Sequence, residues 1–188
     1  MQNQITDEEL VKGCAKEVRH FQELLYAKYN RKMYAVCLRY AKDRDHALDM
    51  LQEGFIKVYN HIGNFSHTGS LEGWIRRIMV NTSINLLRKE KKHLEIDEVK
   101  GGIPSYSSSI VEKMSADEIL ALVTLLPTGY RTVFNMFAIE GYSHKEIASM
   151  LNVAESTSRT QYLKAKNALK KLIKQNNKTL EDVRKENS

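Results

Sequence analysis

The chain has little of what builds sheets, disulfide frameworks or membrane spans. Its 188 residues include two prolines, nine glycines, two cysteines and one tryptophan. No segment alternates strictly between apolar and polar residues, which disfavours half-buried strands. No apolar run is long enough to cross a bilayer, so direct membrane insertion is not expected. What is present instead is a recurrence of apolar residues every three or four positions over long segments, which predicts an all-α fold.

Residue combinations typical of catalysis or metal binding are also missing. Cys14 and Cys37 form neither a Cys-x-x-Cys motif nor a ligand cluster, and Cys37 falls on a core-facing helical position, so two reduced thiols are expected. The six histidines are scattered, and no paired-carboxylate spacing, Ser-His-Asp spacing or Gly-rich phosphate loop occurs. We therefore expect no enzyme, no metal, no cofactor and no small-molecule substrate. An enzyme acting on nucleic acid is kept as a distant alternative.

The charge balance favours a polyanionic partner without establishing one. The chain has 29 lysines and arginines against 23 aspartates and glutamates, which gives a net charge of +6 and a pI near 9.2. The first nine residues are polar and acidic, and they lack the basic start and apolar run of a secretory signal. A cytoplasmic protein is therefore expected.

Helical periodicity fails between residues 93 and 111. There Gly101-Gly102-Ile103-Pro104-Ser105 and three further serines supply the residue types of flexible connectors. We interpret this segment as a flexible linker between two small helical domains, whose relative orientation is then adjustable. The expected organisation is a first domain at residues 1–92, a linker at 93–111, a second domain at 112–176 and a polar tail at 177–188.

The helix expected after Asp43-Arg44-Asp45 has two chemically different sides. Its predicted core face consists of Leu48, Leu51, Phe55, Val58 and Ile62. At 100° per residue the opposite side carries Asp49, Gln52, Glu53 and Ile56. This acidic surface around an exposed isoleucine is either ordinary solvated charge or a docking surface for a basic partner protein.

A second informative helix is expected after the turn at residues 63–69, with Ser70 as its N-cap. One side of it is predicted to carry basic and amide groups, namely Arg77, Asn81, Asn85, Arg88 and Lys89, with Ile84 in the same stripe. Phe65 and Trp74 offer stacking platforms beside it, so single-stranded nucleic acid is a candidate ligand. A packed amphipathic surface helix is the alternative.

The second domain is predicted to contain a helix-turn-helix at residues 143–166. Ser143-x-x-Glu146 is a capping box that opens a short helix, and Asn152-Val153-Ala154 is a tight turn in which Asn152 accepts the left-handed conformation. The following helix is expected to point Ser158, Tyr162, Ala165 and Leu169 inward. Its outward residues suit base edges and phosphates in a major groove, although a plain helical hairpin with a solvated basic face is also possible. These candidates are Ser156, Arg159, Thr160, Leu163 and Lys164.

Taken in chain order, these motifs resemble those of bacterial sigma factors. The run Asp45-x-Ala47-x-Asp49-x-Leu51-Gln52-Glu53-x-Phe55 is similar to sigma region 2.2, and Phe65 through Trp74-Ile75-Arg76-Arg77-Ile78 to Arg88-Lys89 is similar to regions 2.3 and 2.4. Leu126-Pro127-x-x-x-Arg131-x-Val133-Phe134 and Glu140-Gly141-Tyr142-Ser143-x-x-Glu146 resemble region 4. The absence of further domains places the chain with the compact extracytoplasmic-function (ECF) group. Thr157-Ser158-Arg159-Thr160-Gln161 is similar to the version seen in sigma factors from Bacteroidetes.

The resemblance implies a function and a set of partners. The expected fold is a region 2 helical bundle and a four-helix region 4 domain, and the expected partners are core RNA polymerase, through its β′ clamp helices and β flap, promoter DNA and an anti-sigma factor. The surface of Asp49, Gln52, Glu53 and Ile56 is implied to bind the clamp helices. The implied minus-ten contacts are Asn64, Phe65, Trp74, Arg77, Asn81, Asn85, Arg88 and Lys89, with an extruded base held near Asn64 and Phe65. The implied minus-thirty-five contacts are Ser156, Arg159, Thr160, Leu163 and Lys164.

Three positions depart from the family pattern and bear on promoter preference. Asn152 replaces a frequent turn glycine, Ser156 replaces a glycine at the helix start, and Ser158 replaces a common apolar residue. The rival hypothesis is a two-lobed helix-turn-helix regulator that never engages polymerase, which leaves the surfaces of the first domain without a role.

Overall fold

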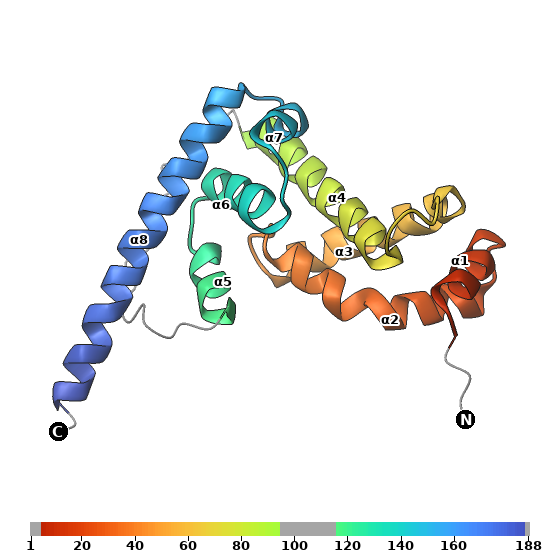
Figure 1. The fold of residues 1–188 in the computed structure, drawn as a ribbon, viewed down its shortest axis with the longest axis horizontal. Helices are drawn as coiled ribbons and strands as arrows, with labels where there is room; N and C mark the ends of the chain where they lie inside the picture. Colours follow the sequence, from red (N-terminus) through yellow and green to blue (C-terminus); the bar gives the residue numbers. More distant parts are fainter. Residues whose placement is uncertain (1–4, 95–115, 187–188) are drawn as a thin grey trace. The chain divides into compact units, whose positions relative to one another are not determined.

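A computed structural model describes residues 5–94 and 116–186, with side chains described for residues 5–90 and 118–175. The chain divides into two compact units, Met1–Lys92 and His93–Ser188, and each is described by itself. Every element in the described ranges is helical, as Figure 1 shows, so the prediction of an all-α fold is confirmed. Apart from residues 93 and 94, the expected linker at 93–111 lies outside the described residues.

The first unit begins with a short helix that the sequence analysis did not predict. Helix α1 (Asp7–Ala15) starts with a capping box, in which the Glu9 backbone N–H donates to the Thr6 hydroxyl and the Thr6 backbone N–H donates to the Glu9 carboxylate. Helix α2 (Arg19–Leu38) packs against it. Lys28 and Tyr29 of α2 both donate to the Asp7 carboxylate, at 2.7 and 2.9 Å, and so join the two helices.

Helix α3 (Arg44–His61) is capped by Asp43, whose carboxylate accepts the His46 backbone N–H at 2.7 Å. It packs against α2 through an arc of buried residues that includes Ala47, Met50, Leu51, Phe55 and Val58. The prediction that Leu48 belongs to the core was wrong, because Leu48 is 42% exposed. It lies about 90° around the helix from the centre of the buried arc, so it falls at the edge of the outer side.

Helix α4 (Leu71–Leu94) follows the 3-10 turn η1 (Ile62–Asn64) and a loop, and Ser70 caps it by accepting the Gly73 backbone N–H at 3.1 Å. It approaches α3 very closely, because a Cβ added to Gly54 would lie 2.2 Å from Met79 Sδ. Only glycine fits this crossing without displacing the thioether. Ile84, expected on the exposed stripe, is buried. A helical angle predicts which way a side chain points and not what covers it.

The second unit is a set of four helices. Helix α5 (Ala116–Thr124) leads through Pro127 into α6 (Thr128–Phe134), which continues as the π-helical turn η2 (Asn135–Ile139) and ends at Gly141 with φ 77°. The buried Arg131 guanidinium donates to the Thr124 carbonyl oxygen at 3.0 Å, which ties α6 to the end of α5. Burial lowers the pKa of this guanidinium from its ordinary value.

The helix-turn-helix is present as predicted. Ser143 and Glu146 form the capping box of α7 (His144–Leu151), and Asn152 ends that helix in the left-handed conformation, with φ 54° and ψ 51°. Helix α8 (Glu155–Glu186) follows the turn and packs against α5, α6 and α7. Its inner side closes one hydrophobic cluster of the unit, formed by Leu122, Val123, Leu126, Ala165, Leu169 and Leu172.

The end of the chain differs from the prediction of a polar tail at 177–188. The backbone of α8 stays helical as far as Glu186. The segment after Leu169 contains no glycine or proline, and its commonest residue is lysine, which is a good helix former. The polarity of these residues is therefore a signal for solvent exposure, and it does not indicate where the helix ends.

Candidate functional site

The outer side of α3 presents the four residues predicted to dock a partner protein. Asp49, Gln52 and Ile56 are exposed, and Ile56 has 59% of its surface accessible. Glu53 is half-buried, and its carboxylate accepts a hydrogen bond from Lys57 Nζ at 2.8 Å in an i,i+4 ion pair. We name Asp49, Gln52, Glu53 and Ile56 the α3 outer face. It combines acidic groups with one exposed branched apolar side chain.

Leu48 belongs beside this face, which the sequence analysis missed. Leu48 and Ile56 are both exposed large apolar side chains and lie on either side of Gln52 along the helix. Two exposed apolar side chains, about two helical turns apart on an otherwise polar side, offer area that a partner protein would remove from water. The sequence could have predicted this position, because Leu48 lies four residues before Gln52 and therefore points to nearly the same side of the helix.

The loop before α4 is built on an aromatic cluster. Phe65 is only 8% exposed, and its ring lies 5.6 Å from the Trp74 ring and 4.8 Å from the His67 ring, measured between centroids. A buried ring has no open face for a base, so the expectation that Phe65 is a stacking platform does not fit this conformation. Phe65 instead packs against Trp74, which is half-buried. Asn64, which precedes Phe65 in the chain, is exposed.

His67 is a further residue of this loop that the sequence analysis did not single out. It is exposed, its backbone has the left-handed φ of 58°, and Gly69 follows with φ 97°. A non-glycine residue with positive φ is uncommon and concentrates at turns and functional sites. The loop therefore places an imidazole at the surface against the Phe65 ring.

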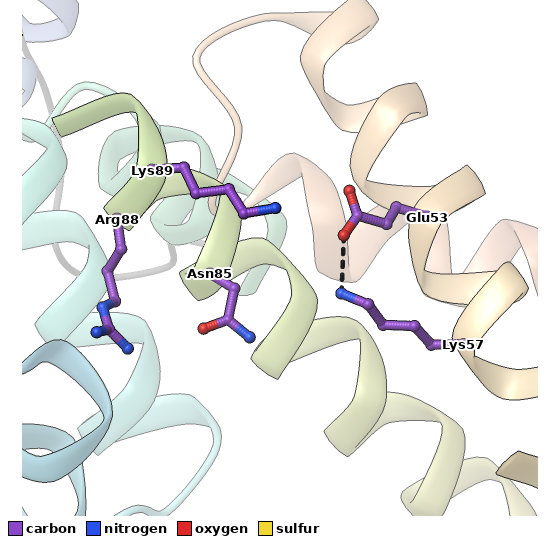
Figure 2. A pocket seen from close by; sticks show the side chains of 5 residues that line it. All are labelled: Glu53, Lys57, Asn85, Arg88 and Lys89. Carbon is purple, nitrogen blue, oxygen red and sulfur yellow. Dashed lines mark hydrogen bonds and ion pairs between the residues drawn. The ribbon is translucent and has the colours of Figure 1, made fainter. Parts of the chain in front are cut away.

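The basic side of α4 is solvent-accessible at all five predicted positions. Arg77, Asn81, Asn85, Arg88 and Lys89 are exposed. The last three of these line a pocket of about 280 Å³ with Glu53 and Lys57 of α3. Figure 2 shows Lys89 extending from α4 toward the ion pair on α3, while Arg88 points away from it. The α3 outer face and the basic side of α4 thus meet at one pocket.

His46 fixes the C-terminal part of α4 relative to α3. The Lys42 backbone N–H donates to His46 Nδ1, one of the two ring nitrogens, at 3.4 Å. Nε2 lies 3.1 Å from the Glu90 carboxylate, directly after Arg88 and Lys89. The imidazole is buried and therefore connects the start of α3 to the basic end of α4.

In the second unit the predicted outward residues of α8 are exposed. Ser156, Arg159, Thr160, Leu163 and Lys164 are all accessible, and Leu163 has 54% of its surface in solvent. The Arg159 guanidinium donates to the Glu155 carboxylate through both Nε and Nη2. Any anion that binds Arg159 must therefore compete with a carboxylate already paired to it.

The inner side of the helix-turn-helix contains a polar contact that explains an unusual residue. Ser158 is completely buried, and its hydroxyl lies 2.9 Å from His144 Nδ1 on α7. The His144 ring stacks on Phe137 with centroids 4.2 Å apart and an interplanar angle of 11°, and Phe137 also contacts Tyr162. Burial, followed by the nearby Arg159 charge, lowers the pKa of His144. A serine replaces the usual apolar residue because it pairs with a neutral imidazole.

Metal clusters, disulfides and membrane spans are absent from the part of the chain that the structure describes, residues 5–94 and 116–186. No group of three or more histidine, cysteine, aspartate or glutamate residues in those ranges is arranged to hold a metal ion. Burial raises the pKa of the Cys14 thiol to about 11 and that of Cys37 to about 12, and neither forms a disulfide. Within 5–94 and 116–186, no helix combines the length and apolar character needed to cross a membrane.

Comparison with known families matches each unit to a different domain. The Sigma-70 region 2 family matches residues 25–93, and the Sigma-70, region 4 family matches residues 116–169. The first match contains α3, the aromatic loop and the basic side of α4, and the second contains the helix-turn-helix. A helix-turn-helix regulator that never engages polymerase is not expected to carry the first of these domains, so that alternative is not favoured.

Similar proteins span nearly the same length as this chain. RNA polymerase sigma-H factor of Pseudomonas aeruginosa is 26% identical over 186 residues, covering 92% of this chain and 96% of its own. ECF RNA polymerase sigma factor SigW of Bacillus subtilis is 28% identical over 184 residues, covering 89% and 98%. ECF RNA polymerase sigma-E factor of Escherichia coli is 27% identical over 182 residues, covering 90% and 95%.

Two solved structures also match over most of this chain. They are the sigma factor RpoE in complex with the anti-sigma factor NepR from Bartonella quintana, and CnrH in complex with the cytosolic domain of CnrY. The first is 16% identical with a TM-score of 0.49 and covers 80% of this chain and 94% of that chain. The second is 19% identical with a TM-score of 0.47 and covers 88% and 96%. With both domains present in order over nearly the full length of its relatives, the chain belongs to the sigma-70 family of RNA polymerase sigma factors, in the extracytoplasmic-function group.

Proposed function

We propose that this sigma factor binds core RNA polymerase through the α3 outer face, captures the melted minus-ten element with the aromatic loop and α4, and reads the minus-thirty-five element with α8. The observation that carries the proposal is the pairing of two chemically opposite surfaces in the first unit with a helix-turn-helix in the second. The polymerase supplies the chemistry of RNA synthesis, and this chain supplies promoter recognition and melting. It then acts where polymerase and DNA are, in the cytoplasm.

The α3 outer face suits the β′ clamp helices of polymerase. Acidic side chains around Ile56 complement a basic helical partner, and charge complementarity sets both the rate and the specificity of such an association. Leu48 adds apolar area next to Gln52. The β flap is proposed as a second polymerase contact, made by the second unit.

The surface of α4 and the preceding loop suits a single strand with one base extruded. Arg77, Arg88 and Lys89 are exposed cations that can neutralise phosphates, while Asn81 and Asn85 carry exposed amide groups that can pair with base edges. Extruding a base costs a few kcal/mol, so stacking and phosphate contacts together must offset it. Trp74, which contacts Phe65, is the stacking side chain of this proposal, and Asn64 is the exposed residue that precedes Phe65 in the loop.

Transcription from purified components tests the proposed function. The full-length chain is combined with core polymerase and a promoter library, and specific transcripts are expected only when both are present. The absence of both core binding and a specific transcript would reject the sigma function. Binding of duplex DNA without core binding would instead support the helix-turn-helix regulator.

Reversing the charge of the α3 outer face tests the polymerase contact. Glu53→Arg is expected to weaken core association because it opposes a basic partner and also repels Lys57. The swap Glu53→Arg with Lys57→Glu restores an intrahelical ion pair while keeping position 53 reversed. If core affinity returns to the wild-type value in the swap, the loss came from the helix and not from the partner. Wild-type affinity of the single variant would contradict the contact.

Arg159 tests the minus-thirty-five contact. Arg159→Ala is expected to cost roughly 1 to 3 kcal/mol of specific binding and to relax the preference at one base pair. Glu155→Gln is the matched variant, because it releases Arg159 from its carboxylate partner and removes a negative charge near DNA. That variant is expected to bind more tightly. Unchanged discrimination among element variants in Arg159→Ala would remove this residue from base reading.

Two finer proposals rest on the resemblance alone. An anti-sigma factor is proposed to control this chain, and co-purification of an inhibitor from cells tests it, with full activity at every expression level as the contrary result. The likeness to sigma factors from Bacteroidetes rests on Thr157-Ser158-Arg159-Thr160-Gln161. Swapping this segment for that of a relative and measuring element preference tests whether it sets promoter choice.

A further inference from the structure

Positive charge in the second unit is concentrated on one helix. Residues 93–188 contain thirteen lysines and arginines against twelve aspartates and glutamates, so this half of the chain is nearly neutral. The segment 156–180 of α8 contains seven of those basic residues and no acidic residue at all. A solvated helix usually mixes charges of both signs along its surface. The segment 156–180 of α8 carries charge of only one sign.

Four lysines extend the DNA-facing side of α8 toward its C-terminus. We name Lys166, Lys170, Lys171 and Lys174 the α8 lysine stripe, and all four are exposed. At 100° per residue they lie in the same half of the helix circumference as Arg159, Thr160 and Leu163. The buried residues Ala165, Leu169 and Leu172 lie on the opposite side. The stripe therefore continues the proposed recognition surface in register.

The lysines of the stripe have no charge partner among the side chains described, residues 5–90 and 118–175. Among the described side chains, the stripe forms no ion pair with an aspartate or glutamate, and Lys166 only lies over the Tyr162 ring at 4.9 Å. Lys166 and Lys170, and likewise Lys170 and Lys174, are like charges at i,i+4, an arrangement that destabilises a helix. An external polyanion relieves this repulsion.

The length of α8 places the stripe beside phosphates. With a rise of 1.5 Å per residue, Lys166 and Lys174 lie roughly 10 and 22 Å beyond Arg159 along the helix axis. The major groove is only about 12 Å wide, so a helix with Arg159 at base edges reaches the phosphates that flank the groove within this distance. The region 4 match ends at residue 169, so Lys170, Lys171 and Lys174 lie beyond the part that the family shares.

We propose that the α8 lysine stripe binds the phosphate backbone of duplex DNA flanking the minus-thirty-five element. The proposal rests on the proposed function in one respect, namely that the N-terminal part of α8 faces DNA. It adds a contact that carries no base preference and that increases affinity for every sequence through counterion release. A basic extension of the recognition helix thereby strengthens the upstream contact without changing its specificity.

The salt dependence of DNA binding tests the stripe directly. The full-length chain is titrated into a labelled mixed-sequence duplex at several salt concentrations, for wild type and for the triple variant Lys170→Gln, Lys171→Gln, Lys174→Gln. Each lost phosphate contact makes the slope of log affinity against log salt shallower by about 0.9, so the triple variant is expected to lose about 2.7. Between 50 and 200 mM salt, wild-type affinity should then fall roughly 40-fold more than that of the variant.

Two controls separate charge from folding. The triple variant with arginine at the same positions keeps the charge and is expected to keep the wild-type slope. Glutamine is a good helix former, and circular dichroism is expected to show that the helix content of the glutamine variant is unchanged. A glutamine variant with the wild-type slope and affinity would overturn the proposal.

Further outcomes distinguish this inference from the proposed function. If the glutamine variant binds DNA like wild type but assembles poorly with core polymerase, the stripe contacts an acidic protein surface and the DNA proposal falls. Sequence preference is measured separately with a library of duplexes. A wild-type chain with no preference in the library would reject promoter reading by α8, whereas a slope difference between variants would still support the phosphate contact.

Discussion

Ser158 of the helix-turn-helix provides a sharp test of the structure, because a buried serine hydroxyl needs a hydrogen-bond partner. Ser158→Ala removes the hydroxyl that lies 2.9 Å from His144 Nδ1. The imidazole nitrogen is then left in a buried position between Phe137 and Tyr162 without a hydrogen-bond partner. We expect the second unit to become less stable, although alanine is the better helix former.

The magnitude follows from two opposing terms. Leaving a buried polar group unsatisfied costs roughly 1 to 3 kcal/mol. Replacing serine by alanine inside a helix regains at most about 0.7 kcal/mol of intrinsic propensity. The free energy of unfolding of the second unit should therefore fall by roughly 0.3 to 2.3 kcal/mol. If the Ser158 hydroxyl had no partner, Ser158→Ala would instead raise the free energy of unfolding, because alanine has the higher helix propensity and no hydrogen bond would be lost.

The assay can observe the two units separately. The single tryptophan, Trp74, lies in the first unit, so its fluorescence follows that unit during urea unfolding. Hydrogen exchange of amides in α7 and α8 follows the second unit. Ser158→Ala is expected to lower protection in α7 and α8 while the fluorescence transition stays at the wild-type urea concentration.

A double-mutant cycle identifies the partner. His144→Phe with Ser158→Ala removes both polar groups, and replacement of both partners by apolar groups is close to neutral. The double variant should therefore be more stable than Ser158→Ala alone, with a coupling energy of about 1 kcal/mol or more. Additive effects, or a Ser158→Ala variant as stable as wild type, would refute the reasoning.

Two further predictions concern pH and packing. Because burial lowers the pKa of His144, the folded second unit favours the neutral ring, so its stability is complete above the ordinary value of 6.5 and falls as pH drops below it. Thermal unfolding against pH should show this loss, and His144→Phe should reduce it; an equal pH dependence in both would contradict the assignment. Gly54→Val should destabilise the first unit by roughly 1 to 3 kcal/mol or more, because its Cβ would lie 2.2 Å from Met79 Sδ. Trp74 fluorescence measures this, and a wild-type urea midpoint would show that the α3–α4 crossing is looser than described.

Much of the second unit was predictable because its signals are local. The capping box of Ser143 and Glu146, the left-handed Asn152 and the inward positions of Ser158 and Ala165 each depend on a few consecutive residues. A capping box and a helical stripe are set by backbone geometry that neighbouring elements hardly change. The same kind of signal at Thr6 and Glu9 was present and was overlooked, so α1 was not predicted.

The errors arose where a side chain's surroundings depend on distant residues. Leu48 was assigned to the core from its apolar character, but it lies outside the arc that α2 covers. Phe65 was expected to offer a stacking platform for a base, but it is buried and its ring contacts Trp74, nine residues further along the chain. Hydrophobicity predicts a tendency to be buried, and only the packing of other elements decides which side chains are covered.

The sequence by itself determined the all-α fold, the order of the two domains, the helix-turn-helix and the residues on the outer sides of α3, α4 and α8, because helical periodicity, caps and motif order are properties of the chain. Only the tertiary structure decided that α3 and α4 cross closely enough to require Gly54, that His46 connects α3 to Glu90, and that Ser158 pairs with His144. Each of these contacts joins residues from different helices. Their distances depend on how whole helices pack, which no local pattern specifies.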